Sequence, residues 1–298
     1  MTQLEANLEA DAAVRNDVTV PRRRTQDPSG RRPPRGARTS VTVRVVQLAL
    51  LVALFGSWQL LAATKVLNPA FVSEPSQYFP SFWHGVDGGG LLGLIGTTLY
   101  ETFVGFALSA ILGLLGGYLL AEFKAFDVII RPFMTGFNSI PRIALAPLFV
   151  LWFGLGSLSR IVLIVSLSFF IVAFNTYAGL QGVNRDHLLL SRVLGASRRE
   201  RFFKFVLPSA APSIFAGLQL ALTYAFLGAV VGEMLTGSDG LGGYLALKMG
   251  SFDTTGFFGG LILLMIVALA VSAIVRALEN RLLRWRAIEL AGTQGGGQ

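Results

Sequence analysis

Long apolar stretches separated by polar segments dominate the pattern of this 298-residue chain. Runs without a charged residue cover 45–64, 102–121, 143–159, 161–184, 205–232 and 254–275. A helix rises about 1.5 Å per residue, so about 20 residues cross a hydrocarbon core about 30 Å thick. The pattern predicts six membrane-spanning helices. The third run is short and follows Pro132 and Pro141, so we expect that span to be tilted, broken or extended upstream.

The expected fold class is an all-α, polytopic membrane helical bundle with three regions. Residues 1–44 are polar and rich in arginine, and we expect a disordered, basic cytoplasmic tail there. Residues 45–282 form the expected transmembrane domain, with its core at about 97–280, and residues 283–298 form a C-terminal cytoplasmic tail. The polar stretch before the first apolar run is long for a cleaved signal peptide, so we expect the first span to be retained.

The formal net charge is +8, and the positions of the positive residues along the chain indicate the membrane topology. Of the 25 lysine and arginine residues, 21 lie at the two ends of the chain or between alternate spans. Cytoplasmic segments of membrane proteins carry such an excess, which predicts that both termini are cytoplasmic and removes the need to invoke nucleic acid as a partner. The arginine cluster of the N-terminal tail is either a topological anchor or a site for membrane lipid or another partner.

Composition excludes several kinds of chemistry. Hydrophobic residues make up 53% of the chain and charged residues only 14%, which does not fit a soluble globule. The chain has no cysteine, and its two histidines are far apart and in no metal-binding motif. No lysine follows a glycine, so the phosphate-binding loop of ATPases is impossible and any ATP must be bound by another chain. We therefore expect no catalytic residue, metal site or cofactor in this chain.

Small residues recur at every fourth position in two spans. The second span has Gly105, Ser109, Gly113 and Gly117, and the fifth has Ser213, Gly217, Ala221, Ala225 and Ala229. This spacing keeps small residues near one helix face and lets another backbone approach closely. The two seams are expected to pack helices within the chain or to form a subunit interface.

The polar segment before the fifth span is the most informative part of the sequence. It reads NRDHLLLSRVLGASRRERFFKFVLP from Asn184 to Pro208. Asn184 or Asp186 can cap a helix, and the leucines and arginines that follow predict an amphipathic helical hairpin against the inner membrane surface. Gly195 permits a sharp change of direction, and Pro208 suits the first turn of the next helix.

This segment resembles the loop signature of binding-protein-dependent ABC importer permeases. The signature is EAA, three residues, G, nine residues, I, any residue, LP, and here GAS at 195–197 and FKFVLP at 203–208 keep its spacing. Leu189, Leu190 and Ser191 replace EAA, which puts any salt bridge of that glutamate in doubt, and Phe205 replaces the isoleucine. The segments NSIPRIALAPLFVLWFGLG at 138–156, NTYAGL at 175–180 and VVGEMLTGSDGLGGYL at 230–245 resemble the nitrate, sulfonate and taurine group of these permeases. The resemblance covers roughly residues 40–285.

The resemblance implies a non-enzymatic permease in the inner membrane that carries a small, often anionic solute. It also implies a cytoplasmic coupling helix that docks on a separate ATPase, a second copy of the permease and an external solute-binding protein. A rigid helix between two spans can pass motion of the ATPase into the bundle. Carried over by position, the coupling residues are Asn184, Asp186, Leu190, Arg192, Leu194, Gly195, Ala196, Ser197, Arg198 and Pro208.

Polar residues within or near the spans are the candidates for a solute pathway. Arg142 either presents positive charge to an anion or reaches the inner headgroups after a break at Pro141. Asn175 is either an interhelical hydrogen-bond partner or a pathway contact. Glu233 either orients the loop SDGLGGYL or contacts the solute or a docking protein, and Glu101 is expected to be an interfacial charge.

Two other classes of function fit the sequence less well. A secondary transporter or channel driven by an ion gradient calls for intramembrane carboxylates or an inverted repeat, and the sequence makes neither evident. A membrane enzyme calls for a nucleophile with a base, and no such constellation is present. The leading prediction is the membrane-spanning permease of an ATP-driven importer.

Overall fold

The computed structural model describes residues 36–64, 73–74, 76–77, 90–237 and 239–282. It divides into two compact units, Met1–Leu54 and Phe55–Gln298. The described part of the first unit belongs to helix α2, Gly36–Ala63. Residues 36–44, expected as part of a disordered tail, are thus helical, because extending a nucleated helix costs little and no proline or further glycine interrupts it. The rest of the expected N-terminal tail and the expected C-terminal tail lie outside the described residues.

All of the regular secondary structure described in the second unit is helical, as its apolar content requires, because helices satisfy their own backbone hydrogen bonds in lipid. Its elements are α4 (Gly90–Glu122), α5 (Lys124–Asn138), η1 (Arg142–Leu145), α6 (Ala146–Phe153), α7 (Ser157–Gln181), α8 (Arg185–Val193), α9 (Arg198–Arg201), η2 (Phe202–Val206), α10 (Leu207–Thr236), α11 (Leu241–Gly250) and α12 (Thr254–Leu282). In the described chain, five helices are long and apolar enough to span a membrane, or up to six if one bent pair counts as a span. The helical-bundle prediction is confirmed, with six as an approximate number of spans.

The bent pair replaces the third predicted span. Helix α5 and the segment Arg142–Phe153 meet at 80° across a short break. The break ends at Pro141, which lacks an amide hydrogen and disfavours helix in the residue before it. Residues 124–131, which lie between the second and third predicted spans, are helical because α5 has its own partners: Asp127 pairs with Arg131 at 3.3 Å and accepts a hydrogen bond from the Tyr177 hydroxyl of α7 at 3.2 Å.

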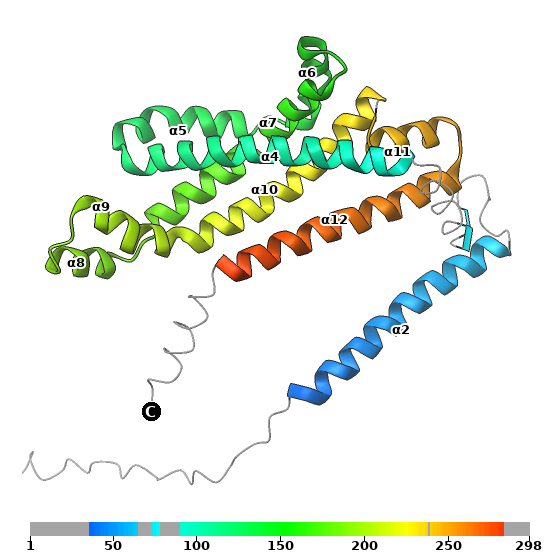
Figure 1. Cartoon of the computed structure of the whole chain (residues 1–298), viewed down its shortest axis with the longest axis horizontal. Helices are drawn as coiled ribbons and strands as arrows, with labels where there is room; N and C mark the ends of the chain where they lie inside the picture. Colours follow the sequence, from blue (N-terminus) through cyan, green and yellow to red (C-terminus); the bar gives the residue numbers. More distant parts are fainter. Residues whose placement is uncertain (1–35, 65–72, 75, 78–89, 238, 283–298) are drawn as a thin grey trace, which may run out of the picture. The chain divides into compact units, whose positions relative to one another are not determined.

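Helix α7 packs along both α4 and α10 (Figure 1). Small residues allow these close contacts: a Cβ added to Gly113 would lie 2.6 Å from Val172, and one added to Gly117 would lie 2.5 Å from the Ala173 carbonyl oxygen. Gly105 faces Ile164 in the same way, and Ser109 is fully buried. Both small-residue seams face α7: on α10, Gly217 approaches Asn175, and the Ala221 carbonyl accepts the Ser168 hydroxyl at 3.0 Å.

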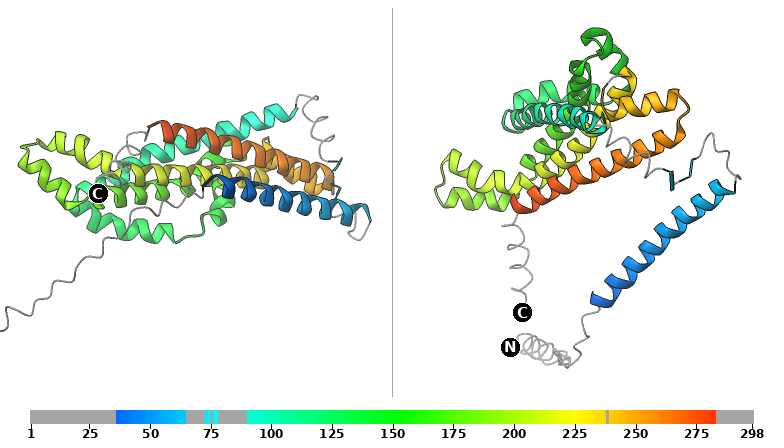
Figure 2. Two further views of the ribbon diagram at one scale, coloured as in Figure 1. Left: turned by 90° about the horizontal axis from the view of Figure 1, so that it is seen from below. Right: turned by 45° about the vertical axis from the view of Figure 1, so that its right-hand side comes forward.

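A cluster of buried apolar side chains joins α12 to the bundle. Its buried members come from α4, α10, α11 and α12, namely Leu91, Leu222, Leu241, Leu263, Val267 and Val271. Helices α8 and α9 lie at one end of α7 and α10, and α11 lies at the other end (Figures 1 and 2). The bundle therefore presents two structurally different ends, one formed by the loop 184–208 and one by the α10–α11 turn.

Candidate functional site

The loop 184–208 is a capped pair of short helices. The Asn184 side chain accepts a hydrogen bond from the Asp186 amide at 2.9 Å, so Asn184 is the N-cap of α8 and Asp186 lies in its first turn. Ser197 and Glu200 form a reciprocal capping box at α9: the Glu200 carboxylate accepts from the Ser197 amide at 3.1 Å, and the Ser197 hydroxyl accepts from the Glu200 amide at 3.3 Å. Such caps stabilise short helices that cannot persist alone.

Gly195 makes the turn between these two helices. Its φ is 69°, a left-handed conformation that residues with a side chain rarely adopt. An added Cβ would meet nothing within 4 Å, so backbone conformation and not space demands glycine here. The Ala196 amide donates to the Ser191 carbonyl at 3.0 Å, which closes the turn, and Ser191 is fully buried.

The same loop exposes apolar side chains. Val193 is 84% exposed, Leu194 66% and Leu190 51%, although all three lie on or beside a helix. Arg192 and Arg198 are exposed nearby, and Ala196 is half-buried. Clusters of exposed apolar side chains rimmed by charge are typical of surfaces that contact another protein or a membrane.

A π-helical turn, η2, connects the loop to the bundle. α9, η2 and α10 form one uninterrupted helical segment, Arg198–Thr236, with Pro208 in the first turn of α10. The Ser209 hydroxyl donates to the Phe205 carbonyl at 2.7 Å beside this proline. The Phe202 ring of η2 packs edge-on against Tyr118 of α4, with centroids 5.4 Å apart. Because the helix is continuous, a displacement of α9 moves the start of α10.

Arg142 lies at the break of the bent pair and faces the middle of α7. Its guanidinium donates to the Leu167 carbonyl at 3.1 Å and the Ser166 carbonyl at 3.3 Å, and it also bonds Asn138. The guanidinium carbon lies 4.8 Å from the Phe170 ring centroid. The residue is only half-buried. The break at Pro141 is therefore present, but the arginine is bound by α7 and by the residue that precedes the break.

Asn175 and Glu233 have structural partners. The side-chain amide of Asn175 donates to the Ile171 carbonyl of its own helix at 2.8 Å, and the rest of this side chain packs on Gly217 of α10. Glu233 is fully buried, and its carboxylate accepts from the Gly242 amide at 2.8 Å and the Thr98 hydroxyl at 3.0 Å. The carboxylate thus joins α10 to α4 and to the start of α11.

The sequence predicted that Glu101 is an interfacial charge, and this prediction is wrong. It is fully buried and pairs with Arg160 at 2.8 Å, and Arg160 is only 4% exposed. Arg160 also donates to the Asp239 carbonyl at 3.1 Å. The charge-free runs place Glu101 and Arg160 at the ends of predicted spans, and this prediction is wrong for both residues. Opposite charges can be buried together when they pair with each other. The α4 helix accordingly begins at Gly90.

The sequence did not reveal Thr98 as a buried partner of Glu233, nor Glu101 and Arg160 as a buried pair. The sequence does contain a sign that Glu101 is buried, because apolar residues lie on both sides of it. A charge at the headgroup boundary would have apolar residues on one side only. The partner could not be identified, because Arg160 lies far along the chain. Among the described residues, no group of three or more acidic or histidine side chains is arranged to hold a metal ion.

The turn between α11 and α12 has its own ion pair. Lys248 lies 2.6 Å from Asp253, whose carboxylate also accepts from the Gly256 amide at 2.8 Å. The bond from Lys248 is the main cause that lowers the pKa of Asp253, with the Gly256 amide second. The turn therefore keeps this contact as the pH falls to the ordinary range of aspartate titration.

The fold and the loop define the membrane-spanning component of a transport system. A family comparison is consistent with this class: residues 109–284 match the binding-protein-dependent transport system inner membrane component. The chain belongs to this family. A putative aliphatic sulfonates transport permease of Bacillus subtilis is 33% identical over 80% of this chain and 87% of its own length. A formylaminopyrimidine transport permease of Halalkalibacterium halodurans is 38% identical over 63% of this chain and 76% of its own length. The taurine transport permease of Escherichia coli is 28% identical over 82% of this chain and 90% of its own.

Solved structures agree on the fold. One, described as inward-facing conformations of the MetNI methionine ABC transporter, has a TM-score of 0.55 at 22% identity, covering 65% of this chain and 94% of that one. The chain is therefore a permease subunit of an ABC importer, a multi-pass inner-membrane protein without enzymatic activity of its own. Family membership implies an ATPase and a solute-binding protein as partners.

Proposed function

We propose that two copies of this chain form the pathway for a small anionic solute, such as a sulfonate, taurine or nitrate-like ion, and that the loop 184–208 couples the pathway to a separate ATPase. The observation that carries the coupling proposal is the exposed apolar surface of Leu190, Val193 and Leu194 on a loop that continues directly into α10. Exposed side chains of this size favour a protein contact. The distribution of lysine and arginine supports a cytoplasmic position for the loop and both termini.

The proposal of an anionic solute rests on the solutes for which related permeases are named and on the position of Arg142. Relatives are named for aliphatic sulfonates and for taurine, which are anionic or zwitterionic, although others are named for formylaminopyrimidine and riboflavin. Arg142 supplies a half-buried positive charge at the break of the bent pair, where a passing anion would gain from it. Glu233 has no exposed surface, and we assign it to the architecture of the α10–α11 turn.

The ion-gradient alternative finds less support. Buried carboxylates, which it requires, are present at Glu101 and Glu233, contrary to the sequence expectation. Glu101, however, is paired with Arg160, and Glu233 is bonded to an amide and a hydroxyl, so both already serve structural contacts. Neither carboxylate is placed to bind and release an ion from solution.

Reconstitution tests the proposed function. The chain, its ATPase subunit and its solute-binding protein are placed in liposomes, and uptake of labelled taurine or alkanesulfonate is measured. Uptake should require ATP and all three components, and ionophores that collapse ion gradients should leave it unchanged. Uptake by the chain alone, driven by an ion gradient, would overturn the proposal. A thermal-shift screen of the solute-binding protein identifies the solute to use.

Arg142→Gln tests the pathway role in the same liposomes. We expect uptake of the anionic solute to fall about tenfold, as for loss of a partly desolvated charge contact, while Arg142→Lys retains more of it. The matched control is Lys124→Gln, which removes an exposed cation from α5 away from the break. Equal uptake by the Arg142→Gln and wild-type proteins would remove Arg142 from the pathway.

A further inference from the structure

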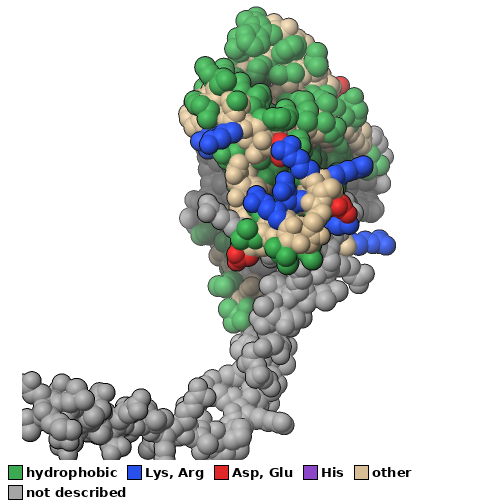
Figure 3. Space-filling model, turned by 90° about the vertical axis from the view of Figure 1, so that its left-hand side faces the viewer, with side chains coloured by type: hydrophobic (Ala, Val, Ile, Leu, Met, Phe, Trp, Pro, Cys, Tyr) green, Lys and Arg blue, Asp and Glu red, His purple; other side chains and the backbone are tan. Residues whose placement is uncertain are grey.

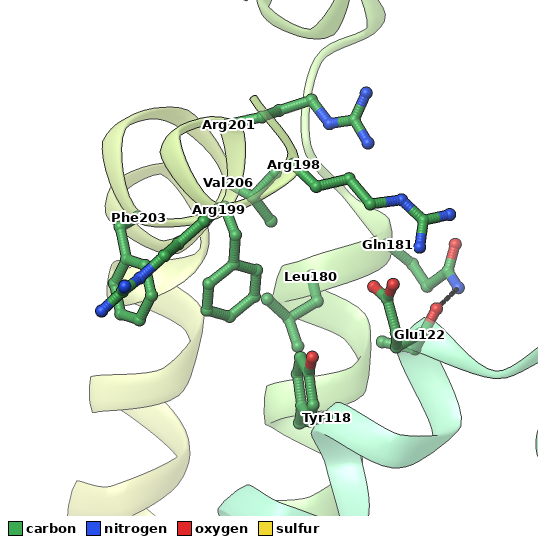
Figure 4. Close-up of a pocket in the computed structure, with 11 residues that line it drawn as sticks. Tyr118, Glu122, Leu180, Gln181, Arg198, Arg199, Arg201, Phe203 and Val206 are labelled. Atoms are coloured by element: carbon green, nitrogen blue, oxygen red, sulfur yellow. Dashed lines mark hydrogen bonds between the residues drawn. The ribbon is translucent and has the colours of Figure 1, made fainter. Parts of the chain in front are cut away.

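A cavity of about 460 Å³ opens at the end of the bundle that carries α8 and α9. Its lining comes from the last turns of α4 and α7 and from α9 and η2 (Figure 4). The volume lies within the range of small-molecule sites, about 300–1,000 Å³. It lies away from the break at Arg142 and from the exposed side chains of Leu190, Val193 and Leu194, which carry the coupling proposal, although Arg198 and its neighbours belong to the same loop 184–208. Neither proposal assigns a ligand to it.

The cavity has an excess of positive charge. Arg198, Arg199 and Arg201 line it, against a single acid, Glu122. None of the three arginines forms an ion pair within the described part of the chain, and the adjacent Glu200 is already paired with Lys204 at 3.0 Å. Lysine and arginine side chains gather on this face of the molecule (Figure 3). Figure 4 shows Arg198 extending toward Gln181 and Glu122 and Arg199 extending to the opposite side.

Apart from Gln181, the remaining wall is made of apolar and aromatic side chains and lies where the membrane-spanning helices end. Tyr118, one turn before the end of α4, and Leu180, the next-to-last residue of α7, form part of it. Phe203, a large apolar side chain beside the arginines, is 56% exposed. A ligand that matches this surface carries negative charge at one end and hydrocarbon at the other.

We propose that this cavity binds the phosphate headgroup of an acidic phospholipid, with the start of an acyl chain against Phe203 and its apolar neighbours. Arginine suits this role because its planar guanidinium donates two parallel hydrogen bonds to phosphate oxygens. Basic pockets between membrane helices at a bilayer surface bind acidic headgroups for the same reason. A docked protein fits less well, because the cavity is concave and its apolar wall belongs to the ends of the spans.

The test measures lipid retention by the full-length chain in detergent micelles. Native mass spectrometry compares palmitoyl-oleoyl phosphatidylglycerol with the zwitterionic phosphatidylcholine of the same chains, and we expect preferential binding of phosphatidylglycerol. Arg199→Gln/Arg201→Gln should weaken that binding roughly 30-fold, at about one tenfold step per 1.4 kcal/mol and about 1 kcal/mol per charge. The matched control, Lys124→Gln/Arg192→Gln, removes the same charge from exposed positions at the same end but outside the cavity, and it should retain the preference.

A second variant changes the volume of the cavity and not its charge. Ala121→Phe places a ring in the cavity wall and should reduce phosphatidylglycerol binding at least as much as the arginine variant, with phosphatidylcholine binding unchanged. Equal losses in the two charge variants, or normal binding by Ala121→Phe, would overturn the proposal in favour of diffuse surface attraction. Displacement of the lipid by millimolar inorganic phosphate would show a free-phosphate site and also overturn it. Because Ala121→Phe and the arginine variant act through different residues, a folding failure in one leaves the other decisive.

Discussion

Gly195 is the residue of the loop 184–208 with the least freedom to change. Its φ of 69° joins α8 to the capped start of α9, and no neighbouring atom limits the space for a side chain. Backbone strain is therefore the whole cost of a substitution. Asparagine tolerates this conformation, whereas a β-branched residue does so at a cost of about 1–2 kcal/mol.

The first prediction follows from this contrast. Gly195→Val should reduce ATP-driven uptake at least tenfold by changing the angle between α8 and α9, while Gly195→Asn keeps most of the activity. Uptake is measured in reconstituted liposomes, and a quantitative blot checks that both variants reach the membrane in equal amounts. Normal uptake by the valine variant would show that the angle of this turn does not matter for coupling.

The Glu101–Arg160 pair carries the second prediction. Both side chains are buried, so Glu101→Leu or Arg160→Met alone leaves the other charge without its partner and should destabilise the protein by about 3–5 kcal/mol. The double variant Glu101→Leu/Arg160→Met should cost clearly less than the sum of the single changes. Unfolding in detergent micelles measures all three, and additive losses would argue that the two charges do not interact.

Helix packing sets the constraints at the scale of elements. Helix α7 touches α4 and α10 closely only because small residues face it at every fourth position. Adjacent glycines on α4 illustrate how local this constraint is. An added Cβ on Gly117 would lie 2.5 Å from a backbone oxygen of α7, whereas one on Gly116 would meet the Phe169 ring at an ordinary 3.7 Å.

Gly117→Ala and Gly116→Ala form the third prediction as a matched pair. The Gly117 variant must push α4 away from α7, and overpacking of this kind costs about 1–3 kcal/mol. The Gly116 variant should be neutral or slightly stabilising, since alanine favours helix more than glycine does. Thermal unfolding in micelles compares them, and equal stability of the two variants would contradict the close α4–α7 contact.

At the scale of the whole molecule, the prediction concerns the oligomeric state of the permease. We expect the purified permease to be a homodimer, because two copies of this chain form the pathway proposed above. Light scattering with the detergent mass subtracted should give twice the mass of the chain. A monomer that binds a different permease chain from the same membrane extract would instead indicate a heterodimer.

How far the sequence anticipates the structure differs from one element to the next. The helical bundle, the Asn184 cap and the turn at Gly195 follow from local patterns, since caps, glycine turns and apolar length act within a few residues. The bent pair was only partly foreseen. Pro141 signals a break, but the helix before it is also held by hydrogen bonds that join Asp127 and Arg131 of α5 to Tyr177 of α7, which no local pattern reveals.

By itself, the sequence determined that this chain crosses the membrane several times, that it binds no ATP by a phosphate loop, and that its 184–208 segment forms two short helices. Only the tertiary structure decided which charges are buried, because the pairing of Glu101 with Arg160 joins residues on different helices. The same holds for the cavity beside Arg198, which the ends of α4 and α7 form together with α9 and η2. The physical reason is that helix formation in lipid is local, whereas neutralising a charge or enclosing a cavity requires groups brought together from distant parts of the chain.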